Sequence, residues 1–151
     1  MAYLIDCDAI AHCEQREDRD VVLNGIVAGV NDDRIKSVEQ VYDELRRWPQ
    51  IQGLFKPIKR QFLIRQYTPE ISELAGQIAE DFPFLFDLTG TRNPDPADPW
   101  LIAAARVMRW TVVTDERQAS TRKIPFVCRQ QNIQVRCIGG PEFFREFGII
   151  P

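Results

Sequence analysis

The sequence predicts an α/β fold: one three-layer α/β/α domain in which helices cover both faces of a mainly parallel β-sheet. Three observations support this prediction. Short apolar runs alternate with segments of helical periodicity, which is typical of chains whose strands pair in parallel. The length of 151 residues suits one domain with a sizeable core. No internal repeat, low-complexity tract or long linker divides the chain, so we expect residues 1–151 to form a single domain.

Three short apolar runs predict buried strands, at residues 3–5, 110–113 and 135–138. Residues 61–65 are compatible with a further strand or with part of a turn. Helical spacing of apolar residues predicts the elements between them, with helices at residues 9–13, 21–30, 38–48, 69–82, 99–108, 124–128 and 141–147. Residues 49–57 are expected to form an irregular or short helical connection.

Capping residues set the expected ends of several helices. Ser37, with Gln40 three positions later, fits a capping box, and Thr68 precedes a proline that suits a first helical position. Asp98 has the residue type of an N-cap, followed by Pro99 at the first helical position. Gly148 is expected to end the last helix.

Acidic residues follow two of the predicted strands. Asp6 ends the first apolar run, and Asp115 and Glu116 follow the run at residues 110–113. A strand in a parallel sheet runs antiparallel to the helix before it, so Asp98 at the helix start should lie at the same edge as Asp115 and Glu116. The carboxyl edge of a parallel sheet is where open α/β folds place ligands.

Glu44, in the predicted helix at residues 38–48, is a further acid expected at this edge of the sheet. It borders the apolar stripe of the helix at residues 38–48 and should therefore face the body of the domain, whereas Asp43 points away. The alternative is a carboxylate that reaches solvent or pairs with Arg47 or Arg60.

Carboxylates gathered in this way repel one another unless a cation or shared protons intervene, and hard oxygen ligands suit Mg²⁺ or Mn²⁺. No His or Cys stands in these motifs to favour zinc. The natural chemistry is metal-assisted transfer of a phosphoryl group to water. That chemistry requires no nucleophilic side chain, so we expect His12 to be a surface or helix residue without a catalytic role.

The net charge of −3 and the pI near 5.2 argue against a protein that coats nucleic acid by bulk attraction. A local basic rim is still possible. Basic residues flank the acidic motifs in predicted loops and are candidates for contact with an RNA backbone, namely Arg92, Arg117, Arg122 and Lys123. Ordinary solubility charge is the alternative for each of them.

No apolar run approaches the roughly 20 residues that span a bilayer, and the first residues carry no signal-like pattern. We therefore expect a cytoplasmic protein without membrane contact. The cysteines show no zinc-type spacing and have apolar neighbours, which predicts buried free thiols at Cys7, Cys13, Cys128 and Cys137.

Several motifs together resemble a known family. They lie, in order, at residues 3–6, 41–45, 97–103, 111–116, 123–128 and 143–148. In this order and at these spacings the chain resembles the PIN-domain ribonucleases, and in particular the small stand-alone PIN proteins similar to VapC toxins.

The resemblance implies a PIN-like nuclease domain and metal-dependent cleavage of RNA. It places the family's metal-binding and catalytic acids on Asp6, Glu44, Asp98 and Glu116, with Asp115 able to substitute for the last as a metal ligand. It also implies an antitoxin protein partner and a homodimer. Aromatic residues near the end, Phe143, Phe144 and Phe147, are candidates for such an interface, or else belong to the core.

Two other functions fit parts of the sequence. Asp6 and Asp8 at the end of the first strand also match the nucleophile and acid of a haloacid-dehalogenase-type phosphatase. That family needs a lysine and a later pair of acids, and no convincing set follows Thr114. The other alternative is a non-catalytic interaction module whose acids only cap helices and form turns.

Overall fold

The computed structural model describes residues 1–65, 67–86 and 96–151. Its centre is a sheet of parallel strands in the order β2-β1-β3-β4. The strands are short: β1 (Tyr3–Ile5), β2 (Ile35–Lys36), β3 (Thr111–Val113) and β4 (Cys137–Ile138). The sequence predicted β1, β3 and β4 within a few residues and missed β2.

Helices make up most of the remaining described chain. The α-helices are α1 (Cys7–Ala11), α2 (Arg19–Asn31), α3 (Glu39–Glu44), α4 (Pro49–Phe55), α5 (Lys59–Phe62), α6 (Pro69–Asp81), α7 (Ala97–Met108), α8 (Ile124–Cys128) and α9 (Gly140–Phe147). Single turns of 3-10 helix occur at η1 (His12–Gln15), η2 (Leu45–Arg47), η3 (Lys56–Ile58) and η4 (Pro83–Leu85).

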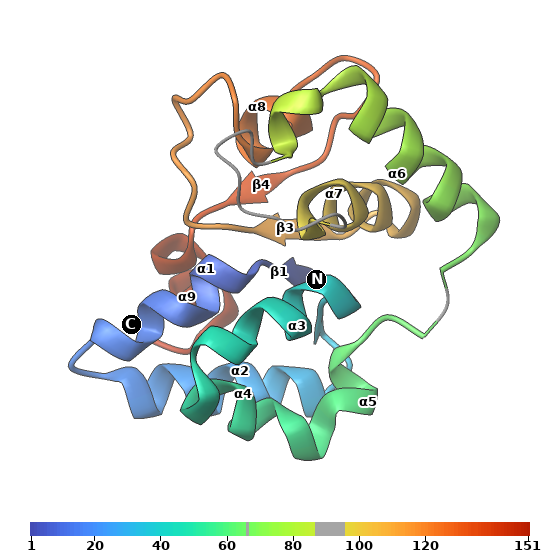
Figure 1. Cartoon of the computed structure of the whole chain (residues 1–151). Helices are drawn as coiled ribbons and strands as arrows, with labels where there is room; N and C mark the ends of the chain where they lie inside the picture. The colour runs from blue at the N-terminus through green and yellow to red at the C-terminus, as the bar shows by residue number, and fades with distance from the viewer. Residues whose placement is uncertain (66, 87–95) are drawn as a thin grey trace.

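The helices form a layer on each side of the sheet (Figure 1). α6 and α7 pack together on one side, and α2 and α9 lie on the other. Tyr3 of β1 contacts α9 through Phe143 and Phe147, with ring centroids 4.8 and 5.7 Å apart. The predicted three-layer α/β fold with a parallel sheet is therefore confirmed.

The core fills the space between these layers. All three residues of β1 are buried, as are all three of β3. Phe143 and Phe144 are fully or almost fully buried and Phe147 is half-buried against them. These aromatic side chains therefore belong to the core, which removes the sequence-based argument for an interface at this helix.

The capping box expected at Ser37 is wrong. Val38 is the residue before α3, and its side chain makes no cap. Ser37 is instead buried at the end of β2, where its hydroxyl donates a hydrogen bond of 2.6 Å to the Ile5 carbonyl. A hydrogen bond between neighbouring strands replaces the local cap because it satisfies a buried hydroxyl.

The expected start of α7 is also corrected. The helix begins at Ala97 after the extended Pro96, so Asp98 lies in the first turn rather than at the N-cap. Pro99 does not prevent this earlier start, because the first N–H groups of a helix have no intrahelical partner. The Asp98 side chain is therefore a first-turn carboxylate.

Other local predictions are confirmed. The Thr68 hydroxyl caps α6 by accepting from the Ile71 N–H at 3.3 Å, and Gly148 ends α9 in the left-handed conformation with φ of 86°. The cysteines are free thiols, of which Cys7, Cys13 and Cys128 are buried and Cys137 is half-buried. Within the described ranges, no helix is long and apolar enough to cross a membrane.

Candidate metal centre

The site begins at the middle of the sheet. From β1 the chain continues to β2 on one side, whereas β3 is followed by β4 on the other, so the strand order reverses between β1 and β3. In open α/β sheets, this switch point leaves a crevice at the carboxyl ends of the strands. Asp6 follows β1 and Thr114 follows β3, and the Asp6 N–H donates to the Val113 carbonyl at 2.8 Å.

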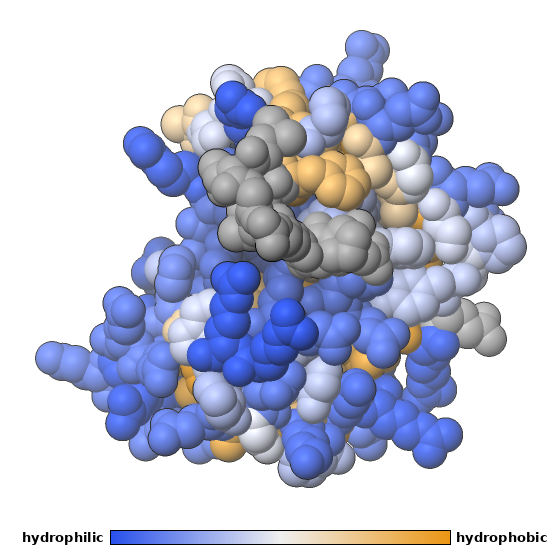
Figure 2. All heavy atoms as spheres, viewed as in Figure 1, coloured by the Kyte–Doolittle hydropathy of each residue, from blue (hydrophilic) through white to orange (hydrophobic). Residues whose placement is uncertain are grey.

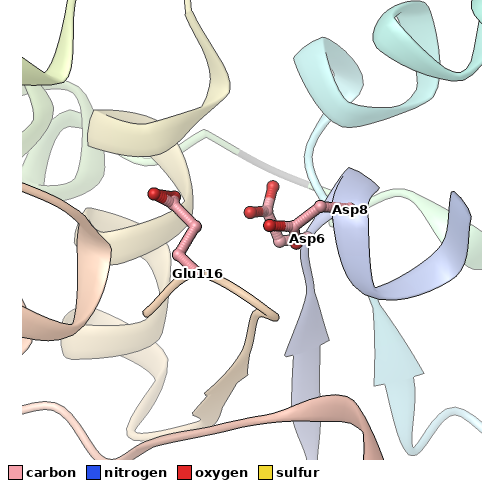
Figure 3. Close-up of side chains that lie close together, drawn as sticks. All are labelled: Asp6, Asp8 and Glu116. Atoms are coloured by element: carbon pink, nitrogen blue, oxygen red, sulfur yellow. The ribbon is translucent and has the colours of Figure 1, made fainter. Parts of the chain in front are cut away.

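Three carboxylates meet in this crevice. Each of Asp6, Asp8 and Glu116 offers an oxygen that lies within 4.8 Å of the oxygens of the other two. Asp6 comes from the end of β1, Asp8 from α1, and Glu116 from the loop after β3 (Figure 3). The two aspartates direct their carboxylates toward the side on which Glu116 lies. Asp6 is only 5% exposed, while Asp8 and Glu116 are half-buried.

Thr114 holds the two aspartates in place. Its hydroxyl lies 3.0 Å from Asp6 Oδ2 and 3.2 Å from Asp8 Oδ1, and can donate to one of them at a time. The same oxygen accepts from the Glu116 N–H at 3.2 Å. Asp6 also accepts from the Cys7 N–H at 2.8 Å, and thereby caps α1. The chain thus orients these carboxylates with neutral groups.

Two further acids act on the same place. Burial raises the pKa of Asp98 well above its usual range, and the nearby charges of Glu116, Glu44 and Asp8 raise it further. Burial likewise raises the pKa of Glu44, against a hydrogen bond with the Ala97 backbone and the charge of Arg47. Arg47 therefore influences Glu44 without removing it from the acidic group. We call these five residues the acidic centre: Asp6, Asp8, Glu44, Asp98 and Glu116.

The electrostatics of the acidic centre favour a cation. Burial raises the pKa of Asp6 well above its usual range, followed by the charges of Asp8 and Asp98. Burial and then Asp8 raise the pKa of Glu116 to about 7, although Lys123 opposes this shift. Lys123 Nζ lies 3.9 Å from Glu116 Oε2 and is largely exposed, so it neutralises the group only in part.

These residues fit Mg²⁺ or Mn²⁺ well. All the donors are carboxylate oxygens, and no His or Cys belongs to the close group of three within the described part of the chain. Hard oxygen ligands suit these ions, and a divalent cation would relieve the repulsion that raises the carboxyl pKa values.

Asp115 lies apart from the close group of three. Its carboxylate accepts a hydrogen bond of 2.7 Å from the Gly140 N–H at the start of α9, and its other oxygen lies 2.9 Å from His12 Nδ1. Asp115 thus connects α9 to η1, and Glu116 is the member of this pair that joins the acidic centre. The His12 side chain is 61% exposed, as expected for a surface residue.

Asp8 is the member of the close group that sequence reasoning omitted. It entered only the phosphatase alternative, because the family resemblance carried over no acid at this position. Its signal was its place two residues after Asp6, in the first turn of the helix that follows β1. Such a residue lies at the same carboxyl edge as the strand end.

The predicted basic rim lies partly beside the acidic centre. Arg117, Arg122 and Lys123 are exposed, whereas Arg92 falls outside the described residues. A pocket of about 560 Å³ opens next to Glu116 and is lined, among described residues, by Asp115, Glu116, Arg117, Ala119, Ser120 and Lys123. It therefore presents both signs of charge at the edge of the site.

Comparison with known proteins gives one result. The sequence profile of a domain of unknown function, DUF4411, matches residues 3–149, and no curated protein matches the chain. The matched range contains every residue of the acidic centre and extends from β1 through α9. The chain therefore belongs to the DUF4411 family.

Proposed function

We propose that this protein is a metal-dependent endoribonuclease that hydrolyses RNA phosphodiester bonds and leaves a 5′ phosphate. One observation carries the proposal: Asp6, Asp8 and Glu116 offer carboxylate oxygens within 4.8 Å of one another at the switch point of a parallel sheet. The charges of Asp98 and Glu44 also act on this group. Binding of Mg²⁺ or Mn²⁺ there would supply charge stabilisation and activate a water molecule for attack on a phosphodiester.

The chain's own residues would have distinct tasks in this reaction. Asp6, Asp8 and Glu116 would hold the cation, since their oxygens already converge. Thr114 would keep Asp6 and Asp8 in position through its buried hydroxyl. Asp98 and Glu44 lie close enough to influence these charges and would orient further ligands or water.

RNA as the substrate and a toxin role both come from the resemblance to PIN-domain proteins similar to VapC. We therefore include in the proposal a cytoplasmic protein that forms a homodimer and is inhibited by a small antitoxin protein. Purification from the native host tests this part: a small protein should co-purify, and light scattering should give a mass above 17.5 kDa. A bare monomer at all accessible concentrations would count against it.

A phosphatase of the haloacid-dehalogenase type is the second candidate, because Asp6 and Asp8 match its pair of acids. The two carboxylates lie close enough to share contact with the Thr114 hydroxyl. Burial of Asp6 disfavours it. A nucleophilic carboxylate needs an open path to phosphorus, yet Asp6 is 5% exposed and both of its oxygens accept hydrogen bonds. A phosphatase would hydrolyse para-nitrophenyl phosphate, whereas the proposed nuclease would leave it unchanged.

The main test is cleavage of a labelled single-stranded RNA with Mn²⁺ and with excess EDTA. We expect cleavage only with metal, and products with a 5′ phosphate. Asp6→Asn keeps a good N-cap for α1 but removes a ligand charge, so it should fold and lose activity at least a hundredfold. Asp20→Asn, on the exposed start of α2, is the matched control and should cleave normally. Full cleavage activity in excess EDTA would contradict the proposal.

A further inference from the structure

We propose that residues 46–65, here called the basic segment, bind the phosphate backbone of single-stranded RNA and lead it toward the acidic centre. The segment comprises the last two residues of η2, then α4, η3 and α5 with the residues that follow α5. This surface is separate from the basic rim near Glu116. The choice of RNA as the ligand rests on the proposed function, whereas the preference for a polyanion rests on charge alone.

The basic segment is unusual in its charge. Residues 45–69 contain no Asp or Glu, although the whole chain has a net charge of −3. All the charged residues in this stretch are cations: Arg46, Arg47, Lys56, Lys59, Arg60 and Arg65. An acidic protein that concentrates cations in one stretch produces a local positive field, which attracts polyanions and steers their approach.

Several of these cations have no acidic partner. In the described part of the chain, Lys56, Arg60 and Arg65 form no ion pair. The charge of Arg47 acts on Glu44, and Lys59 Nζ lies 4.5 Å from the centroid of the Tyr42 ring. Elsewhere, Arg16 pairs with Asp18 at 2.7 Å and Arg136 with Glu146 at 2.6 Å. The charges of Lys56, Arg60 and Arg65 are therefore available to a ligand rather than neutralised within the protein.

The segment also has a concave surface. A pocket of about 660 Å³ is lined, among described residues, by Arg60, Gln61, Leu63, Ile64 and Arg65. Arg60 and Arg65 are both exposed and offer planar guanidinium groups, which match phosphate geometry. Figure 2 shows mostly hydrophilic side chains over the lower part of the molecule, where Figure 1 places α3, α4 and α5.

Hydrogen bonds connect this pocket to the carboxyl edge of the sheet. The Ile64 N–H donates to the Ser37 carbonyl at 3.0 Å, and the Ser37 hydroxyl donates to the Ile5 carbonyl at 2.6 Å. Ile5 immediately precedes Asp6. Ile64 therefore lies beside the end of β2, about 10 Å, or two strand spacings, from the end of β1.

An aromatic pair lies between the end of the basic segment and the start of α7, which carries Asp98. Tyr67 follows Arg65 by two residues and Trp100 follows Asp98 by two, and their rings meet edge to face at 5.3 Å. The chain that leaves the basic pocket thus contacts the helix that carries Asp98. A single-stranded RNA bound at Arg60 and Arg65 would run along the carboxyl edge of the sheet, where the acidic centre lies.

A membrane surface is the other large polyanion to consider, and the segment disfavours it. Leu54 is the only large hydrophobic residue of the segment that is substantially exposed, at 41%. Peripheral membrane segments bury an apolar face in the interface in addition to their charges. One exposed leucine provides little of that.

The test is binding of a fluorescent single-stranded RNA in EDTA, where metal-dependent cleavage is prevented, measured by anisotropy across a salt series. The variant Arg60→Ala/Arg65→Ala should bind about tenfold more weakly, and its dependence of log affinity on log salt should be shallower by about 1.4 if two phosphate contacts are lost. Arg60→Lys/Arg65→Lys should regain most of the salt dependence. Arg19→Ala/Arg145→Ala, which removes two exposed cations on α2 and α9, is the matched control and should bind like the wild type.

Each outcome separates this inference from the proposed nuclease. Thermal melting identifies any variant that fails to fold. Equal affinity and equal salt dependence for the wild type and folded Arg60→Ala/Arg65→Ala would overturn the inference. Binding to anionic lipid vesicles is measured for the same two proteins. A variant that loses binding to the vesicles but binds RNA like the wild type would also overturn the inference. Wild type that binds RNA through these arginines but leaves it intact with Mn²⁺ would support this inference and overturn the nuclease proposal.

Discussion

Thr114 is the uncharged residue on which the geometry of the acidic centre depends. Its side chain is fully buried and contacts Asp6, Asp8 and the Glu116 N–H. A hydroxyl is suited to this position because it donates and accepts at the same atom. A lysine or arginine there would neutralise the carboxylates and compete with a cation. The site therefore keeps its negative charge while its side chains stay oriented.

Asp98→Asn tests the acidic centre at the residue scale. The change keeps the shape of the side chain in the first turn of α7 but removes a charge that burial and its acidic neighbours disfavour. The metal-free variant should therefore melt at the same or a higher temperature than the wild type. Saturating Mn²⁺ should raise the wild-type Tm by about 5–10 °C through mass action, and the variant's much less.

The measurement is thermal melting of both proteins with EDTA and with Mn²⁺, together with RNA cleavage. The variant should be nearly inactive, whereas Asp20→Asn should match the wild type in both assays. Equal metal-induced shifts combined with equal activity would exclude Asp98 from the metal site.

His12→Ala tests whether the mechanism uses imidazole. His12 contacts Asp115, but its side chain is 61% exposed and Asp115 keeps its hydrogen bond from Gly140. Exposed ion pairs contribute at most about 1 kcal/mol, so stability should change little. RNA cleavage should stay within about twofold of the wild type. A hundredfold loss of activity in a folded variant would show that acids alone do not account for the reaction.

At the element scale, close contact between α2 and the sheet depends on a small residue. A Cβ added at Gly29 would lie 2.3 Å from Ile35 Cδ1 and 3.0 Å from Phe147 Cζ. Ile35 is fully buried in β2, and Phe147 belongs to α9. The absence of a side chain at this position therefore lets α2 approach both the strand and the last helix.

Gly29→Ala is expected to lower the Tm by about 3–6 °C. The added methyl group overpacks the core, and this destabilises the protein more than the higher helix propensity of alanine stabilises it. The free energy of unfolding should fall by about 1–2 kcal/mol. Gly53→Ala is the matched control, because an added Cβ meets no atom within 4 Å there. It should stabilise α4 by about 0.5–1 kcal/mol and raise the Tm slightly. Thermal melts of both variants decide the matter, and a Gly29→Ala protein that melts above the wild type would contradict this account of the packing.

The whole molecule combines a partly buried acidic centre with a surface of mixed charge, and this makes its stability depend on pH. Burial and neighbouring carboxylates raise the pKa of Glu116 from 4.5 to about 7 and those of Asp6 and Asp98 well above 3.8. Between about pH 4.5 and 7, the folded protein therefore holds protons that the unfolded chain has released. Under this condition the free energy of unfolding falls as the pH rises.

The metal-free protein should thus melt at a lower temperature at pH 8 than at pH 5. The shift of Glu116 alone amounts to about 2 kcal/mol after allowance for screening, or roughly 5 °C in Tm. Glu146, whose pKa Arg136 and Tyr3 lower to about 2, contributes with the opposite sign but only below pH 4.5. Mn²⁺ should restore the Tm at pH 8, and Asp98→Asn should weaken the pH dependence. A Tm that rises from pH 5 to pH 8 in EDTA would refute the expectation.

The sequence by itself determined the class of fold and the edge at which the acids gather. Apolar runs identified β1, β3 and β4, and helical periodicity identified α6, α7 and α9. These signals are local, because a strand or helix must bury its apolar face wherever it packs. The rule that parallel strands share a carboxyl edge then predicted that Asp6, Asp98 and Glu116 lie at the same edge. Helix periodicity predicted that Glu44 faces the body of the domain.

Only the tertiary structure decided which oxygens converge. The two residues of β2 are too few for a sequence pattern, and Ser37 left its expected cap to bond with Ile5, 32 positions earlier. Asp8 joined the close group and Asp115 turned to Gly140 because of hydrogen bonds formed across the fold, such as that between Thr114 and Asp8, 106 positions apart. Local pattern selects the elements, but the partner of a buried polar group is chosen by whichever atom the packed chain brings within hydrogen-bond distance.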